Sequence, residues 1–163
     1  MKNGNLSSRQ LRRKPLLLLT LFLAACSSDW VPFSSGELDG EVAQVPADWS
    51  QFADAEVIQL ETNPVDPYSV KLWVIDMDGS LYVHAGANRA TWVAHIESSP
   101  LVRLESEGKI YELQASRVTS ADEFAQFSEI YKSKYGNYPR NRNINEIYLF
   151  RLTPRVGTAP DVW

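Results

Sequence analysis

The sequence has 163 residues, with 16 lysines and arginines against 20 aspartates and glutamates, which gives a formal net charge of −4. The single cysteine, Cys26, excludes an intrachain disulfide and any metal site built from two or more thiolates. Five basic residues and no acidic ones lie in the first 25 positions, so the remainder has eleven basic against twenty acidic residues. This acidic balance disfavours a nucleic-acid partner, because phosphate backbones are bound by clustered lysine and arginine.

The first 25 residues are predicted to be an export signal. A basic segment is followed by an apolar run over residues 16–23, which is shorter than the ~20 residues that a membrane-spanning helix needs. Residues 23–26 read Leu-Ala-Ala-Cys, which resembles the lipobox of bacterial lipoproteins, in which the signal is cut before the cysteine and lipid is attached to it. We therefore expect lipid on Cys26 and attachment to the membrane of the cell envelope. An ordinary secretory signal that ends near a cysteine is the alternative.

The residues after Cys26 bear on sorting and on domain limits. Serines at 27 and 28, rather than an aspartate next to the cysteine, resemble lipoproteins of the outer membrane that face the periplasm. Residues 26–47 are predicted to be a flexible tether, because proline, glycine and serine interrupt every periodic pattern. Residues 48–155 are enough for one compact domain, and residues 156–163 are predicted to be a short tail.

The domain is predicted to be mainly β, with six strands. Alternating or apolar runs separated by turn residues place them at Glu56–Thr62, Val70–Met77, the run after Asp78-Gly79, Leu101–Glu105, Lys109–Val118 and Asn145–Thr153. Asp78-Gly79 between two apolar runs is a strong hairpin signal, and Glu107-Gly108 marks a second hairpin. Val70–Met77 is apolar on both faces, which predicts a strand covered on both sides.

Two helices are predicted between the strands. Ser120 and Glu123 form a capping box, aromatic residues recur at spacings of three and four up to Tyr135, and Gly136 is placed as a C-terminal cap. A shorter helix is predicted over residues 90–98, with Pro100 beyond its end. Three strands, a short helix, two strands, a longer helix and a last strand indicate an α+β fold built on a small barrel.

This order, together with the segments LWVIDMDGSLYVHAG, NRATWVAHIESSPLVRLESEGK and IYKSKYGNYP, resembles the pyridoxamine 5′-phosphate oxidase-like, FMN-binding split-barrel superfamily. Within it, the sequence is most similar to a small branch of unknown function that has a tryptophan in the first helix and Lys-Tyr-Gly after the second. The resemblance covers residues 57–154. It implies a six-stranded split β-barrel that forms a homodimer and holds FMN or a related flavin in a groove between subunits. Haem binding, known elsewhere in the superfamily, would need one axial histidine, His84 or His95.

A cofactor phosphate needs cations and backbone N–H groups, which the segment from His84 to Trp92 provides. Gly86 would permit close approach and Arg89 would clamp the phosphate. Trp73 or Trp92 would lie against a ring. Lys71 is the basic residue nearest the start of the second strand. In the alternative interpretation Gly86 makes a turn, Arg89 is solvated, His84 is structural and Trp92 belongs to the core.

The sequence departs from flavin-binding relatives at this second strand, where they commonly place basic residues and this chain has Tyr68 and Ser69. Residues 140–143, Arg-Asn-Arg-Asn, would restore two cations if they fold over the groove; the alternative is a solvated turn. Two functions therefore stay open. One is a flavin-dependent oxidoreductase of unknown substrate, in which the cofactor does the chemistry. The other is a non-catalytic envelope module that binds a small ligand or a partner protein.

Overall fold

The computed structural model describes Met1 and residues 34–52, 54–86 and 89–155. The predicted export signal apart from Met1, Cys26, the first part of the predicted tether (residues 27–33) and the predicted tail (residues 156–163) thus lie outside the described residues. The elements, in chain order, are β1 (Ser34–Ser35), β2 (Glu41–Ala43), the short 3₁₀ helix η1 (Ser50–Phe52), β3 (Val57–Thr62), β4 (Tyr68–Met77), β5 (Ser80–Ala85), α1 (Thr91–Ser98), β6 (Leu101–Ser106), β7 (Lys109–Arg117), α2 (Ala121–Tyr135) and β8 (Tyr148–Pro154).

Six of the strands close into an antiparallel barrel. Neighbouring strands pair in the order β4, β3, β6, β7, β8 and β5, and pairing of β5 with β4 completes the ring. The two predicted hairpins join strands in this ring. Asp78 and Gly79 have φ of 52° and 72°, and Glu107 and Gly108 have 54° and 74°. These left-handed pairs form turns whose twist matches that of the flanking strands. The structure confirms the predicted six-stranded split barrel with two helices.

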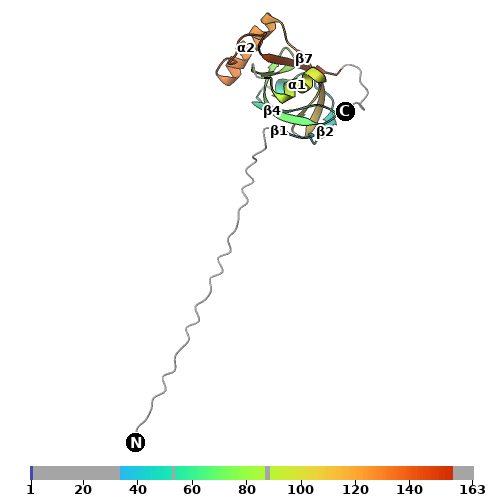
Figure 1. Cartoon of the computed structure of the whole chain (residues 1–163), viewed down its shortest axis with the longest axis vertical. Coiled ribbons are helices and arrows are strands. Elements are labelled where there is room, and N and C mark those ends of the chain that lie inside the picture. The colour runs from blue at the N-terminus through green and yellow to red at the C-terminus, as the bar shows by residue number, and fades with distance from the viewer. Residues whose placement is uncertain (2–33, 53, 87–88, 156–163) are drawn as a thin grey trace. The chain divides into compact units, whose positions relative to one another are not determined.

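Two apolar clusters lie on opposite sides of the barrel wall. The interior contains inward residues from all six strands, such as Leu60 and Leu104, and α1 adds Trp92, Val93 and Ile96. The second cluster lies between α2 and the outer face of the wall, where Ile75, Tyr82 and Leu149 pack against it. In Figure 1, α2 lies on the outside of the barrel. From Val74 onward β4 is therefore covered on both sides as predicted, whereas Lys71 and Trp73, which precede Val74 on the strand, are exposed.

The helices end as the sequence predicts. Ser120 Oγ accepts a hydrogen bond from Glu123 N–H at the start of α2, and Gly136 adopts the left-handed conformation at its end, with φ of 77°. The carboxylate of Glu123 does not complete the capping box, because it accepts a hydrogen bond from the Tyr82 hydroxyl at 2.9 Å. Within the described part of the chain, no helix is both long and apolar enough to cross a membrane.

The segment before residue 48 differs from the predicted flexible tether, since its described part pairs with the barrel. β1 lies antiparallel to β4 and β2 lies parallel to β7. Between them, Leu38 N–H donates a hydrogen bond to the fully buried carboxylate of Glu61. Residues 34–43, the N-terminal strap, therefore belong to the folded unit. The folded unit thus begins before residue 48.

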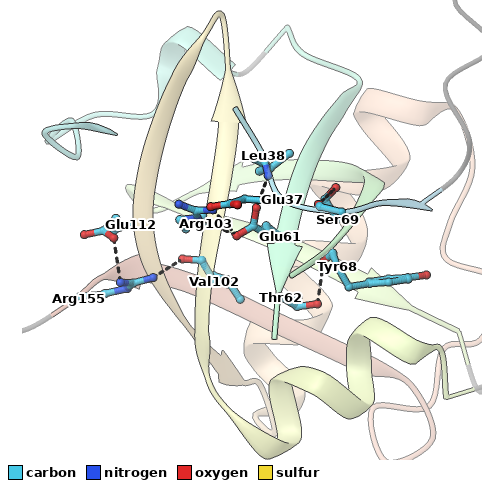
Figure 2. A network of polar contacts seen from close by, with 11 residues as sticks. Glu37, Leu38, Glu61, Thr62, Tyr68, Ser69, Val102, Arg103, Glu112 and Arg155 are labelled. Atoms are coloured by element: carbon cyan, nitrogen blue, oxygen red, sulfur yellow. Dashed lines mark hydrogen bonds and ion pairs between the residues drawn. The ribbon is translucent and has the colours of Figure 1, made fainter. Parts of the chain in front are cut away.

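A buried ion pair fixes the strap to the barrel. Glu61 on β3 and Arg103 on β6 are register partners, and an Arg103 nitrogen lies 2.7 Å from a Glu61 carboxylate oxygen. Glu37 of the strap also binds Arg103, at 3.2 Å. Figure 2 shows both carboxylates meeting the Arg103 guanidinium next to Leu38. Because removing one partner of such a pair leaves a buried charge unpaired, the strap is part of what keeps this pair satisfied.

Candidate functional site

A cavity of about 410 Å³ lies on the outer face of β4 and β5. We call it the Trp73 cavity. Its walls come from β4, β5, α2 and the segment that follows α2, and the lining residues are Trp73, His84, Gly86, Tyr131, Asn137, Pro139, Arg140 and Asn141. The volume falls in the ~300–1,000 Å³ range of small-molecule sites. Three residues predicted from the sequence, Trp73, His84 and Gly86, are brought together here.

Trp73 gives the cavity a flat aromatic wall. Its indole stacks on the Tyr135 ring, with 4.7 Å between ring centroids and 14° between planes, and it also contacts Tyr131. Although it is packed on Tyr135, Trp73 remains 47% exposed. An indole supported on one side and open on the other is suited to contact with a planar ligand.

His84 on β5 also lines the cavity and packs against two aromatic rings of α2. Its imidazole meets the Tyr131 ring edge-on at 5.0 Å and the Phe127 ring at 5.6 Å. Burial lowers the pKa of His84 to about 4. The imidazole is therefore neutral at physiological pH, with one ring nitrogen able to donate a hydrogen bond and the other able to accept one.

The end of α2 fixes the position of Trp73. The last register pair between β3 and β4 is Val57 with Trp73, and Val74 lies one residue beyond it. The Tyr135 hydroxyl accepts a hydrogen bond from Val74 N–H at 3.1 Å, and Lys134 Nζ donates to Val74 O at 3.1 Å and Ala55 O at 2.7 Å. These side chains bond to β4 just beyond the last residue paired with β3.

The Lys-Tyr-Gly stretch noted in the sequence thus has a structural role. Burial lowers the pKa of Lys134, which the carboxylates of Asp54, Asp76 and Glu56 oppose, and burial raises the pKa of Tyr135 to about 12. Tyr135 is therefore protonated at physiological pH. Tyr135 thus stacks on the Trp73 ring and also hydrogen-bonds the backbone of Val74, the residue after Trp73.

Residues 137–141 cover one side of the cavity and bring a cation to it. Pro139 is buried, whereas Arg140 is exposed, and Arg140 is close enough to oppose the rise that burial causes in the Tyr131 pKa. Among the described residues, the Arg140 guanidinium makes no ion pair. Arg142, the second arginine of this segment, instead lies over the Tyr138 ring, 4.3 Å from its centroid, and lines a different surface.

Three further predicted site residues lie outside this lining. Arg89 pairs with Glu97 at 2.7 Å along the exposed side of α1. Trp92 is buried in the barrel interior, edge-on to Phe150. Lys71 lines another surface hollow beside Glu105 and Glu107. Of the two histidines, His95 does not line the cavity, and its Nδ1 lies 3.1 Å from Thr62 Oγ1.

Sequence reasoning did not single out Tyr131 and Asn137 as lining residues. Tyr131 is one of the aromatic residues that recur along the predicted longer helix, but that pattern does not tell which turn of a helix borders a cavity. Asn137 follows the helix cap, where nothing in the sequence marks it. Across residues 34–52, 54–86 and 89–155, no group of three or more histidine, aspartate or glutamate side chains is arranged to hold a metal ion.

Comparisons with known proteins bear on the fold. No protein-family model matches the sequence. No curated protein matches it. Among solved structures, Campylobacter jejuni ChuZ is 13% identical with a TM-score of 0.53, over 65% of this chain and 51% of ChuZ, so the chain spans about half of that protein.

Two further solved structures cover more of their own length. A candidate pyridoxamine 5′-phosphate oxidase from Listeria innocua is 12% identical with a TM-score of 0.51, over 65% of this chain and 89% of its own. A candidate 5-nitroimidazole antibiotic resistance protein from Bacteroides thetaiotaomicron is 10% identical with a TM-score of 0.51, over 73% and 86%. At these identities the likeness concerns the fold. The chain has the split-barrel fold of pyridoxamine 5′-phosphate oxidase-like proteins, as its sequence predicts.

Proposed function

We propose that this protein is a lipoprotein of the cell envelope whose barrel binds a flavin or a related planar aromatic molecule in the Trp73 cavity. The observation that carries the proposal is the half-exposed indole of Trp73, stacked on Tyr135 and facing a cavity of about 410 Å³. The anchor is proposed from the sequence around Cys26.

The ring of a flavin suits this cavity better than its phosphate does. The flat wall of Trp73 and Tyr135 offers stacking, and the amide oxygen of Asn137 offers an acceptor for the polar edge of a ring. The Asn137 amide nitrogen donates to Tyr135 O, and the Asn141 amide is bonded to Glu146 and Asn143. A phosphate would meet a single lining cation, Arg140. The residues present therefore support recognition of the ring more than recognition of a phosphate.

The chemistry of the lining favours binding over catalysis. No lining residue is a carboxylate or a thiol, and the low pKa of His84 leaves it without a proton to deliver as an acid near neutral pH. A bound flavin would itself supply redox chemistry, and the side chains here would hold and orient it. We therefore propose the binding role, with an oxidoreductase activity as its extension if a flavin is retained.

Titration of flavin fluorescence tests the proposal. The full chain, extracted from membranes in mild detergent, is added to riboflavin or FMN, and stacking on Trp73 should quench the flavin emission in a saturable way at micromolar concentrations. Trp73→Ala should weaken binding about two- to tenfold, because an aromatic pair contributes about 0.5–1.5 kcal/mol. Val65→Ala, an exposed apolar control outside the cavity lining, should leave binding unchanged.

Two results would contradict the proposal. The first is an absence of saturable quenching for either flavin at tens of micromolar. The second is equal binding by wild type and Trp73→Ala, which would place the ligand elsewhere. Light scattering on the same sample gives the number of chains per particle and tests the homodimer expected from the family resemblance.

A further inference from the structure

We infer that the Trp73 cavity selects a planar ligand with one negative charge rather than a doubly charged phosphate. The inference rests on the proposed ring-binding function and specifies its ligand class. It follows from where the chain places its cations. Outside the first 25 residues the sequence has eleven lysines and arginines, and all eleven fall within the described residues. Arg140 is the one among them that lines the cavity.

Four of the other cations are committed to carboxylates elsewhere. Arg89 pairs with Glu97, Arg103 with Glu61 and Glu37, Arg151 with Glu123, and Arg155 with Glu112. The first of these is the residue expected to clamp a phosphate, and its guanidinium instead bonds Glu97, the seventh residue of α1. Each of these pairs would have to break before its cation could reach a ligand.

The remaining cations are held by other groups or lie on other surfaces. Lys134 bonds the carbonyls of Ala55 and Val74, and Arg117 bonds that of Ile147. Lys132 and Arg142 lie over the Tyr138 ring. Lys71 and Lys109 line separate hollows that they share with Glu107. None of these six lines the Trp73 cavity.

The charge requirement of a phosphate exceeds what this lining provides. A phosphate monoester carries about −1.5 to −2 charges at pH 7 and three acceptor oxygens. One guanidinium neutralises one charge and pairs with two oxygens. The surrounding chain is acidic, with eleven basic against twenty acidic residues beyond position 25, so the second charge meets repulsion rather than a partner. A singly charged group avoids this mismatch.

Three probes with the same ring and ribityl arm isolate the charge. Riboflavin is neutral, riboflavin 5′-sulfate carries one negative charge and FMN carries nearly two. We expect riboflavin 5′-sulfate to bind about tenfold more tightly than riboflavin, because Arg140 adds a charge-assisted hydrogen bond, and FMN to bind no more tightly than the sulfate. Dissociation constants are measured by flavin fluorescence at pH 7.5 and one fixed ionic strength, with the detergent-solubilised full chain.

Matched arginine variants assign the preference. Arg140→Ala should bring riboflavin 5′-sulfate to the affinity of riboflavin, whereas Arg142→Ala, two residues away and outside the lining, should keep the preference. Binding of riboflavin should be unchanged in Arg142→Ala, and saturable riboflavin binding should persist in Arg140→Ala, so that the ratio of the sulfate and riboflavin dissociation constants can be compared in both variants.

The outcomes separate this inference from the proposed function. FMN binding threefold or more tightly than the sulfate would overturn the inference, since further cations would then reach the phosphate. A preference for the sulfate that survives Arg140→Ala would overturn it as well. If none of the three probes binds, the ring-binding function itself falls, and the ligand class with it.

Discussion

His84 is held neutral by its surroundings, and this has a consequence for stability. The imidazole lies among the rings of Phe127 and Tyr131, which offer a positive charge no solvation comparable to water. Burial lowers the pKa of His84 from 6.5 to about 4. In the unfolded chain the same side chain takes up a proton near pH 6.5. Folding is therefore coupled to the release of a proton in the range between these two values.

The stability of the protein should fall as the pH is lowered from 6.5 to 4. In this window the unfolded state binds a proton that the folded state does not. Lowering the pH from 6.5 to 4 therefore decreases the free energy of unfolding by about 3 kcal/mol. His84→Phe should remove this part of the pH dependence. Urea unfolding at pH 7 and pH 4 measures it. Asp76, whose pKa is raised by burial, contributes the opposite slope in both proteins and cancels in the difference. Identical pH dependence in wild type and variant would contradict the assignment.

Sequence reasoning reached some site residues and not their arrangement. Trp73, His84 and Gly86 were proposed from their chemistry, and the Asp78-Gly79 hairpin brings them together, because Trp73 and His84 lie on the two strands that it joins and Gly86 directly follows the second strand. Arg89 was expected to point at a ligand from the start of α1, but a charged side chain takes whichever partner lies nearest, here Glu97. Local pattern does not encode that choice.

At the scale of the element, the end of α2 does more than terminate a helix. Lys134 and Tyr135 bond the backbone of β4 at Val74, just past its last pairing with β3. Their side chains satisfy a strand N–H and C=O that would otherwise be buried without partners. The helix thus keeps the Trp73 wall in place through backbone contacts and ring stacking together.

Loss of the Tyr135 hydroxyl should therefore destabilise the fold. Tyr135→Phe keeps the stacked ring but leaves Val74 N–H without its partner, which costs about 1–3 kcal/mol. Lys134→Met should lower the free energy of unfolding by a similar amount. Lys132→Met, an exposed lysine of the same turn, should change it by at most about 0.5 kcal/mol. Urea unfolding compares the three, and equal effects at positions 132 and 134 would refute this role.

Elements with strong local signals were predicted and those made by distant pairing were not. The caps of α2 and the two left-handed hairpin turns follow from residues adjacent in sequence, Ser120 and Gly136 for the helix. β1 and β2 are two and three residues long, and only their partners β4 and β7 define them as strands. A segment rich in proline, glycine and serine carries no periodic pattern from which such pairing could be inferred.

At the scale of the whole molecule, the proposed anchor depends on one atom, the sulfur of Cys26. In cells that export lipoproteins, Cys26→Ser should abolish labelling by radioactive palmitate and leave an uncleaved or soluble precursor, because serine offers no thiol for lipid attachment. Ser27→Ala should label as wild type does. Cell fractionation and autoradiography measure both. A Cys26→Ser protein that stays labelled and membrane-bound would rule out the lipobox interpretation.

The N-terminal strap sets how far such an anchor would let the barrel travel. Counted from the sequence, a tether ending at residue 47 would reach about 75 Å when fully extended. With β1 docked on β4, seven residues, 27–33, separate Cys26 from the barrel, and their greatest span is about 25 Å. Ser34 pairs with Val70, three residues before Trp73 on the same strand. If Cys26 is lipidated, this short linker would keep the barrel close to the membrane, where it would meet ligands near the bilayer surface rather than throughout the periplasm.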